Sequence, residues 1–169
     1  VVVDIQKDFV DGTLGTKEAV GIIDNCVEKI KNFDGEIIVT YDTHTDDYMN
    51  TAEGKKLPVV HCVKDTDGWQ LNEKIAKALS NKEYIKVEKP TFGSVQLPEV
   101  ISKAASDEDF DITLIGLCTD ICVVSNALLL KANFYEKEIY VDSSCCAGVS
   151  LATHNASLDT MRCCQINVI

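Results

Sequence analysis

Three side chains that together could carry out nucleophilic chemistry stand where short apolar runs end: Asp4, Lys89 and Cys122. Cys122 lies in the stretch Gly116–Val123, directly after the apolar run Ile112–Ile115, at the expected start of a helix. Unpaired backbone N–H groups and the positive end of the helix dipole favour a thiolate at such a position. A carboxylate can accept the thiol proton, and a lysine between the two holds the negative charge in place. The three residue types indicate covalent catalysis through a cysteine.

The turn into this helix offers a second element of the same chemistry. Backbone N–H groups of Cys118 and Cys122 could stabilise an oxyanion that forms when a carbonyl group is attacked. Taken alone, each residue also has a plain structural interpretation. Cys122 could pack as a small apolar residue, Asp4 could end a strand, and Lys89 could be a solvated lysine.

A second group of residues has the composition of a metal site: Asp42, His44, Glu53 and His61. Asp-x-His after a strand places both side chains beyond the strand end, and nitrogen and carboxylate ligands suit zinc, iron or manganese. The alternative is a polar loop with solvated histidines. The third histidine, His154, is expected to have a surface or structural role.

Aromatic residues flank both groups. Phe9, Trp69 and Phe92 could form the wall of a site for a small planar substrate, although core packing or loop anchoring explains each of them equally well. Asp8 and Asp46 are interpreted as turn or solvated carboxylates.

The elements that must position these residues alternate between strands and helices. The expected strands are Val1–Asp4, Glu36–Tyr41, Tyr84–Glu88, Asp111–Ile115, Glu138–Val141 and Gln165–Ile169. The expected helices are Lys17–Asn32, Glu73–Leu79, Leu97–Ala105, Thr119–Phe134 and Ala152–Met161. This alternation predicts a single doubly wound α/β domain over residues 1–169, with a six-stranded, mainly parallel sheet and helices on both faces. In such a sheet, ligands bind beyond the carboxyl ends of the strands, where Asp4, Asp42, Lys89 and Cys122 would converge.

The composition and charge of the chain indicate which partners and which cellular compartment are expected. The formal net charge of −11 argues against nucleic acid or an anionic membrane, because phosphate binding needs a basic face. No apolar run approaches the length of a membrane span, and no signal-peptide pattern precedes the first strand. The chain starts at Val1 inside a strand, so we expect that a few residues are missing. The eight cysteines include no CxxC motif and do not resemble a disulfide framework, which favours a reducing, cytoplasmic setting.

Three segments resemble the motifs of isochorismatase-like cysteine hydrolases, in the same order along nearly the whole chain: Asp4–Val10, Lys89–Ser94 and Gly116–Val123. The resemblance implies a catalytic triad of Asp4, Lys89 and Cys122, and a cis peptide bond between Leu117 and Cys118. Within the family, the metal-like residues and the segment from His61 to Leu71 look most like nicotinamidases and pyrazinamidases. Where many nicotinamidases have Trp-Pro-Pro before the last histidine, this chain has Pro58-Val59-Val60.

The reaction implied by the resemblance is hydrolysis of nicotinamide to nicotinate and ammonia through a cysteine thioester, a step of NAD salvage. It also implies one divalent metal ion, most simply zinc, that binds the pyridine nitrogen and orients the ring. The expected partner is a small-molecule amide, without nucleic acid or membrane, and association into a homo-oligomer is left open.

Two alternatives remain at this stage. One is a metal-independent cysteine hydrolase of the same family that acts on another small amide or carbamoyl compound. The other is a non-catalytic, metal-binding α/β protein whose cysteines are core residues.

Overall fold

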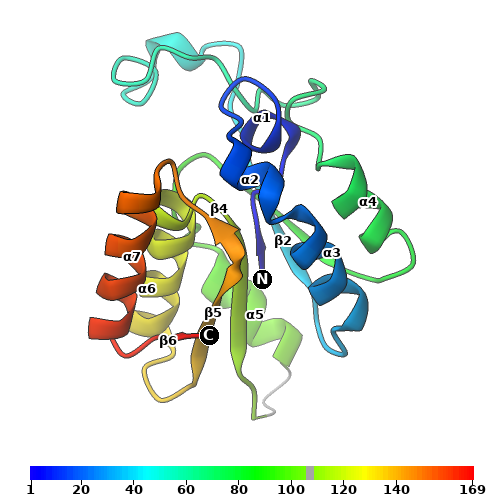
Figure 1. The fold of residues 1–169 in the computed structure, drawn as a ribbon, viewed down its shortest axis with the longest axis vertical. Coiled ribbons are helices and arrows are strands. Elements are labelled where there is room, and N and C mark those ends of the chain that lie inside the picture. Colours follow the sequence, from blue (N-terminus) through cyan, green and yellow to red (C-terminus); the bar gives the residue numbers. More distant parts are fainter. Residues whose placement is uncertain (106–108) are drawn as a thin grey trace.

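A six-stranded parallel sheet organises the chain, as the sequence predicts (Figure 1). The computed structural model describes residues 1–105 and 109–169. The sheet has the order β3-β2-β1-β4-β5-β6, and every pairing is parallel. The strands are β1 (Val2–Val3), β2 (Ile38–Asp42), β3 (Ile85–Lys89), β4 (Ile112–Leu117), β5 (Ile139–Ala147) and β6 (Asn167–Val168). The strand order reverses at β1, which places the topological switch point between β1 and β4.

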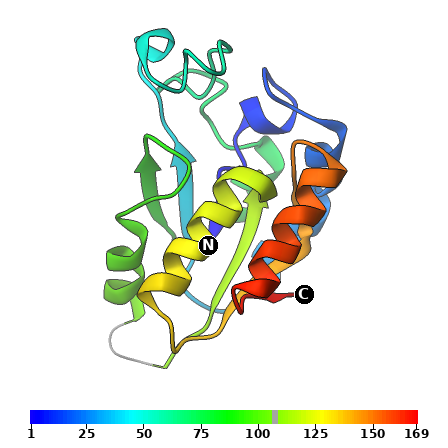
Figure 2. The same cartoon turned by 90° about the vertical axis from the view of Figure 1, so that its left-hand side faces the viewer.

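Helices cover both faces of the sheet (Figures 1 and 2). The helices are α1 (Lys7–Val10), α2 (Lys17–Gly21), α3 (Ile23–Asn32), α4 (Glu73–Leu79), α5 (Leu97–Ala105), α6 (Val124–Asn133) and α7 (Leu151–Cys163). A 3₁₀ turn, η1, spans Tyr48–Asn50, and a π-helical turn, η2, spans Thr119–Val123. The first four helices contribute to the core on one face, and α5, α6 and α7 to the core on the other.

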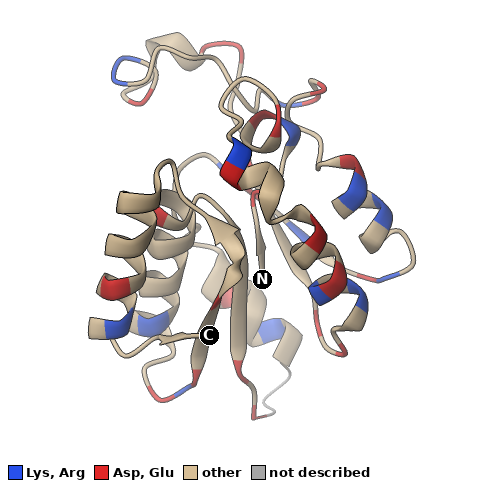
Figure 3. Cartoon of the chain, viewed as in Figure 1, with Lys and Arg blue, Asp and Glu red and all other residues tan. Residues whose placement is uncertain are grey.

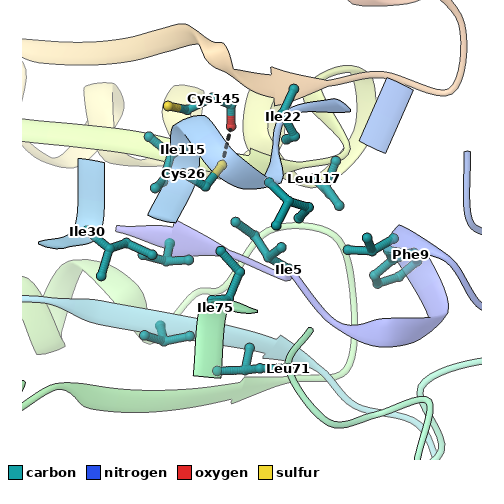
Figure 4. Packing of buried hydrophobic residues seen from close by; sticks show 14 of the residues in the cluster. Ile5, Phe9, Ile22, Cys26, Ile30, Leu71, Ile75, Ile115, Leu117 and Cys145 are labelled. Carbon is teal, nitrogen blue, oxygen red and sulfur yellow. Dashed lines mark hydrogen bonds between the residues drawn. The ribbon is translucent and has the colours of Figure 1, made fainter. Parts of the chain in front are cut away.

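Helical spacing of apolar residues explains how each helix is held against the sheet. In α3, the buried residues Ile23, Cys26 and Ile30 recur every three or four positions and so form one apolar stripe. Figure 4 shows Cys26 and Ile30 packed with Ile75 and with β4 residue Ile115, and the Cys26 thiol donates a hydrogen bond to the Cys145 carbonyl at 3.4 Å. Acidic and basic residues both occur along α3 and α4 (Figure 3), and none of them is among the buried residues of these helices.

Several element boundaries differ from the sequence predictions. The expected helix Lys17–Asn32 is two helices, and the expected helix Thr119–Phe134 begins with the π-helical turn, so that regular α-helix starts only at Val124. Strand β5 continues beyond Val141 to Ala147, because it pairs with β4 again after a register shift, with Leu114 opposite Val141 and Gly116 opposite Cys146. Neither α1 nor η1 was predicted.

The long connection between β2 and α4 rises above the carboxyl edge of the sheet in both views (Figures 1 and 2). Its two ends are tied to each other by the parallel bridge between His44 and Val63, so the polar residues between them form a loop over the strand ends. Within the described ranges 1–105 and 109–169, no helix is long and apolar enough to cross a membrane.

Candidate active site

The predicted triad forms one buried cluster at the carboxyl ends of β1, β3 and β4. The Lys89 Nζ atom lies 2.7 Å from Asp4 Oδ2 and donates a hydrogen bond to Cys122 Sγ at 3.5 Å. All three residues are buried, with exposed fractions of 0% for Asp4, 1% for Lys89 and 5% for Cys122. The lysine therefore stands between the carboxylate and the thiol, as the sequence interpretation requires.

Asp4 is held in a tightly defined position just beyond β1. Its φ of +48° lies in the left-handed region, and its backbone N–H donates to the Thr40 carbonyl at 3.2 Å. The Thr40 hydroxyl donates to Asp4 Oδ1 at 2.7 Å. The other carboxylate oxygen, Oδ2, faces the Lys89 ammonium at 2.7 Å and has no other polar partner among the described residues. Asp4 is thus fixed through one oxygen by Thr40 and through the other by Lys89.

Asp42 connects the triad to the predicted metal ligands. Its Oδ1 accepts a hydrogen bond from Lys89 Nζ at 3.2 Å, while its Oδ2 lies 3.0 Å from His44 Nε2 and 3.6 Å from His61 Nε2. Asp42 is itself fixed by Gln6, a fully buried residue whose side chain accepts from the Asp42 N–H and donates to the Asp42 carbonyl. One carboxylate therefore faces both groups.

Asp42, His44 and His61 have the geometry of a metal site. One ligand atom from each lies within 4.8 Å of the others, and all three residues are buried. Glu53 Oε1 lies 3.8 Å from His44 Nε2 and 3.7 Å from His61 Nε2, from a partly exposed side chain. Zinc bonds of about 2.1 Å in a tetrahedral arrangement imply separations of about 3.4 Å between ligand atoms, which is close to these distances.

Two buried nitrogen atoms in this group have the state that a metal ligand needs. His61 Nδ1 is 2.8 Å from the Val59 carbonyl, so Nδ1 carries a proton and Nε2 is the ring atom that faces Asp42 and could ligate a metal. His44 Nε2 is buried without a hydrogen-bond partner in the described part of the chain. An unpartnered buried acceptor is costly, and a cation between the three side chains would satisfy it.

Asp8 fixes the backbone next to His61, a role that the sequence analysis did not predict. Instead of being a turn or solvated carboxylate, Asp8 is buried, and its Oδ2 accepts from the Cys62 N–H at 2.8 Å, next to the predicted ligand His61. Its Oδ1 accepts from the Thr13 hydroxyl. The backbone of Gly68 packs so closely on this carboxylate that a Cβ there would lie 2.1 Å from Asp8 Oδ2.

Burial determines the charge of the nucleophile. The pKa of the Cys122 thiol is raised well above its ordinary value, chiefly because the thiol is desolvated, and the nearby Asp4 raises it further. Lys89 acts in the opposite direction but does not outweigh burial. Burial therefore opposes the thiolate that a helix start favours, and Cys122 lies in the π-helical turn η2 rather than in the first turn of α6.

The two charged members of the triad stabilise each other. Burial raises the pKa of Asp4, and the Lys89 ammonium counteracts this rise only in part. For Lys89, burial alone would lower the pKa, but the Asp4 carboxylate reverses the effect and the pKa is raised above its usual range. The resting site thus contains a protonated lysine, and a carboxyl group whose proton affinity is higher than usual.

The turn that carries the nucleophile depends on close backbone packing. Gly116 has a φ of +127°, and a Cβ at this position would lie 2.1 Å from the Val3 carbonyl oxygen, so the end of β4 can lie against β1 only with glycine there. The peptide bond between Leu117 and Cys118 is cis, as the resemblance implied. The Thr119 hydroxyl, at the start of the π-helical turn, is 2.8 Å from His154 Nδ1, so His154 has the structural role expected for it.

The three aromatic residues have different environments. Phe9 meets the His61 ring edge-on, with 5.5 Å between ring centroids, and Phe92 is 42% exposed in the loop after β3. Trp69 does not occupy the position expected of a substrate wall. It packs on Tyr41 in the core and donates its Nε1–H to the Thr43 hydroxyl. These contacts hold the indole on the side of β2 that Tyr41 faces, and Asp42 faces the opposite side.

The whole chain matches one known protein domain. The family model for the isochorismatase domain matches residues 1–169. The chain belongs to the isochorismatase family. Among curated proteins, none matches the sequence of this family member.

Solved structures resemble this isochorismatase-family chain over almost its full length. The nicotinamidase/pyrazinamidase of Bacillus subtilis is 22% identical, with a TM-score of 0.81 and coverage of 99% of this chain and 96% of that one. The pyrazinamidase of Pyrococcus horikoshii, solved in complex with zinc, is 22% identical, with a TM-score of 0.78 and the same coverage. The yeast nicotinamidase bound to the inhibitor nicotinaldehyde is 19% identical, with a TM-score of 0.82 and coverage of 99% and 97%. At these identities the likeness establishes the fold.

Proposed function

We propose that this isochorismatase-family protein is a cysteine amidohydrolase that converts nicotinamide to nicotinate and ammonia. The observation that carries the proposal is the shared carboxylate Asp42, which joins the Asp4–Lys89–Cys122 cluster to His44 and His61. The thiol and the carboxylate could act on an amide group, while a metal ion held by the neighbouring histidines could bind an atom of the ring that carries the amide. This combination suits a small heteroaromatic amide. The solved structures with similar folds are nicotinamidases and pyrazinamidases, which supports this substrate class.

The first half of the reaction transfers the acyl group to sulfur. Asp4 Oδ2 takes the proton of the Cys122 thiol as Sγ attacks the amide carbon, and the amide oxygen becomes an oxyanion that accepts from the backbone N–H groups of Cys118 and Cys122. The C–N bond then breaks, Asp4 returns the proton to the leaving nitrogen, and ammonia departs. The product of this half is a Cys122 thioester.

The second half releases the acid. Asp4 takes a proton from a water molecule, which attacks the thioester carbon, and the C–S bond breaks. The sulfur leaves as the Cys122 thiol after it recovers the proton, and the carboxylic acid is released. Throughout both halves, Lys89 stays protonated because two carboxylates face it, and its contacts with Asp4 Oδ2 and Cys122 Sγ hold the two groups in one cluster.

Asp42, His44 and His61 would hold a divalent metal ion, and Glu53 is placed to join them. We propose zinc, with iron or manganese as the other metals that suit nitrogen and carboxylate ligands. When bound, the ion supplies a Lewis-acid position for a ring nitrogen. Phe9, against the His61 ring, and Phe92, in the loop after β3, are the proposed aromatic contacts of the substrate.

An ammonia-release assay over a panel of small amides tests the function. The panel contains nicotinamide, pyrazinamide, benzamide and a carbamoyl compound, and metal content is measured on protein purified without chelator. We expect ammonia from the two heteroaromatic amides at rates well above those for benzamide, which lacks the ring nitrogen. In parallel, mass spectrometry of an acid-quenched reaction should detect a nicotinoyl adduct on Cys122.

Two cysteine variants provide the control. Cys122→Ala should lower kcat by several orders of magnitude, because a nucleophile and its base act as a unit. Cys26→Ala removes a buried thiol on α3 and should leave the rate essentially unchanged. Activity on the carbamoyl compound alone, without bound metal, would instead support the metal-independent alternative. No ammonia from any amide, with a Cys122 no more reactive than the other cysteines, would support the non-catalytic alternative.

A further inference from the structure

Asn126, in the first turn of α6, uses its whole carboxamide inside the protein. Its Nδ2 group donates to the Cys122 carbonyl at 2.8 Å and to the Phe92 carbonyl at 3.2 Å, and its Oδ1 accepts from the Ser94 N–H at 2.9 Å. The residue is fully buried. No role for Asn126 follows from the proposed chemistry, so these three bonds require a separate explanation.

The bonds join two segments that come from different strands. Cys122 follows β4, whereas Phe92 and Ser94 belong to the loop after β3. The same loop is held at its start by Lys89, whose Nζ donates to the Thr91 carbonyl at 3.0 Å and to Cys122 Sγ. The loop is therefore fixed at one end by the lysine of the triad and at the other by Asn126, and both fixed points also contact Cys122.

Only a carboxamide of this length meets the requirements of the position. Two carbonyl oxygens need donors and one N–H needs an acceptor, and the side chain of asparagine supplies both. Aspartate at position 126 would accept from Ser94 but would turn an oxygen toward the Phe92 and Cys122 carbonyls. Serine would keep a bond within the helix, as neighbouring Ser125 does by donating to the Ile121 carbonyl at 2.6 Å, but would be too short to reach the loop.

We propose that Asn126 is a positioning residue of the active site, which locks the Phe92–Ser94 loop to the backbone of the nucleophile. It acts through Cys122 and Phe92 and does not touch the reacting atoms. Its effect on turnover rests on the proposed function, but its effect on the loop does not. Misplacement of reacting groups by about 1 Å can reduce rates about 100-fold, which sets the scale of the effect.

The test uses Asn126→Ser, which separates the loop bonds from the helix bond. We expect kcat for nicotinamide to fall about 10- to 100-fold. We also expect hydrogen exchange of the Ser94 amide to accelerate about 10-fold or more, while amides in the centre of β4 keep their protection. The matched control is Asn133→Ser on the same helix, because Asn133 also donates to the carbonyl four residues earlier but is exposed. It should leave both measurements within about twofold.

Each outcome decides the inference. Wild-type Ser94 exchange and kcat in Asn126→Ser would overturn it. Uniform acceleration of exchange across the protein would assign Asn126 to stability alone and would also overturn it. If Asn126→Ser does not fold, Asn126→Asp takes its place, and failure of both to fold overturns the positioning role. If the wild-type protein hydrolyses no amide, the proposed function fails, and the Ser94 exchange together with the alkylation rate of Cys122 still tests the inference.

Discussion

Replacement of Lys89 by methionine tests how the triad is held together. Methionine is close to lysine in length and removes only the charge and the donors. The Lys89 side chain is completely buried, with Nζ 2.7 Å from Asp4 Oδ2 and 3.2 Å from Asp42 Oδ1. Removal of one partner from a buried ion pair leaves an uncompensated charge and costs about 3–5 kcal/mol. We expect Lys89→Met to lower the free energy of unfolding at neutral pH by this amount.

The size of the expected loss in Lys89→Met depends on the burial of the ion pair rather than on its length, and a second lysine of the chain separates these two factors. Lys103 lies 2.6 Å from Glu99 on α5, but its side chain is 75% exposed. Exposed pairs at this helical spacing contribute about 0.3–0.5 kcal/mol, because water screens them. Lys103→Met should therefore cost about a tenth as much as Lys89→Met, although the two contact distances are nearly equal. Urea unfolding of both variants gives the comparison directly.

The pH dependence gives an independent check of the same reasoning. Burial already raises the pKa of Asp4, and loss of the lysine removes the group that opposes this rise. The folded variant then holds a proton that the unfolded chain has released, so its stability falls as the pH rises above the ordinary range of a carboxyl group. The deficit of Lys89→Met should be largest near about pH 7 and smaller near about pH 5. The double variant Lys89→Met/Asp4→Asn should recover part of the lost stability. A deficit no larger than that of Lys103→Met, or one independent of pH, would refute this account.

Three further predictions concern the supports of the site. Asp8→Asn should weaken zinc binding about 10- to 100-fold in competition with a chromophoric chelator, because Asp8 holds the Cys62 N–H beside a metal ligand; unchanged affinity would contradict this. Burial lowers the pKa of His154, so stability should fall as the pH drops below about 6.5, and His154→Gln should flatten this part of the unfolding profile. Gly116→Ala should lower the free energy of unfolding by at least about 2 kcal/mol in urea unfolding. Gly21→Ala, whose added Cβ has no atom within contact distance, should leave the free energy of unfolding unchanged or raise it by up to about 1 kcal/mol.

The sequence was sufficient to predict which side chains converge at the carboxyl ends of the strands. Apolar runs that alternate with helical segments predicted the parallel sheet, and the rule for carboxyl ends then brought Asp4, Asp42, Lys89 and Cys122 together. The helices α4 and α5 begin and end at the predicted residues, since Asn72 caps the first and the apolar spacing of the second is regular. Short irregular elements gave no comparable signal, because α1 and η1 are too short to show a period.

The residues that sequence analysis missed are buried polar ones whose partners are distant along the chain. Gln6 and Thr40 are each 36 residues from the partners that they hold, and Asp8 is 54 residues from Cys62. A polar residue in an apolar run indicates that some partner exists, because a buried polar group must be satisfied. It does not say which partner. The two interpretations of Trp69, as a substrate wall or as a core residue, stayed open for the same reason, because its hydrogen bond to Thr43 depends on how the loop folds back.

The pKa of Cys122 shows why the position of a thiol at a helix start does not by itself decide its charge in a buried site. A helix start favours a thiolate through a few backbone N–H groups, whereas desolvation acts on the whole thiol and is the largest of the causes that raise the pKa of Cys122. The same burial raises the pKa of Asp4, so the proton affinities of thiol and base rise together. Proton transfer between them then depends on the difference between the two pKa values, and Lys89 contacts both groups. The reactivity proposed for Cys122 is therefore a property of the Asp4–Lys89–Cys122 cluster as much as of the helix that carries the cysteine.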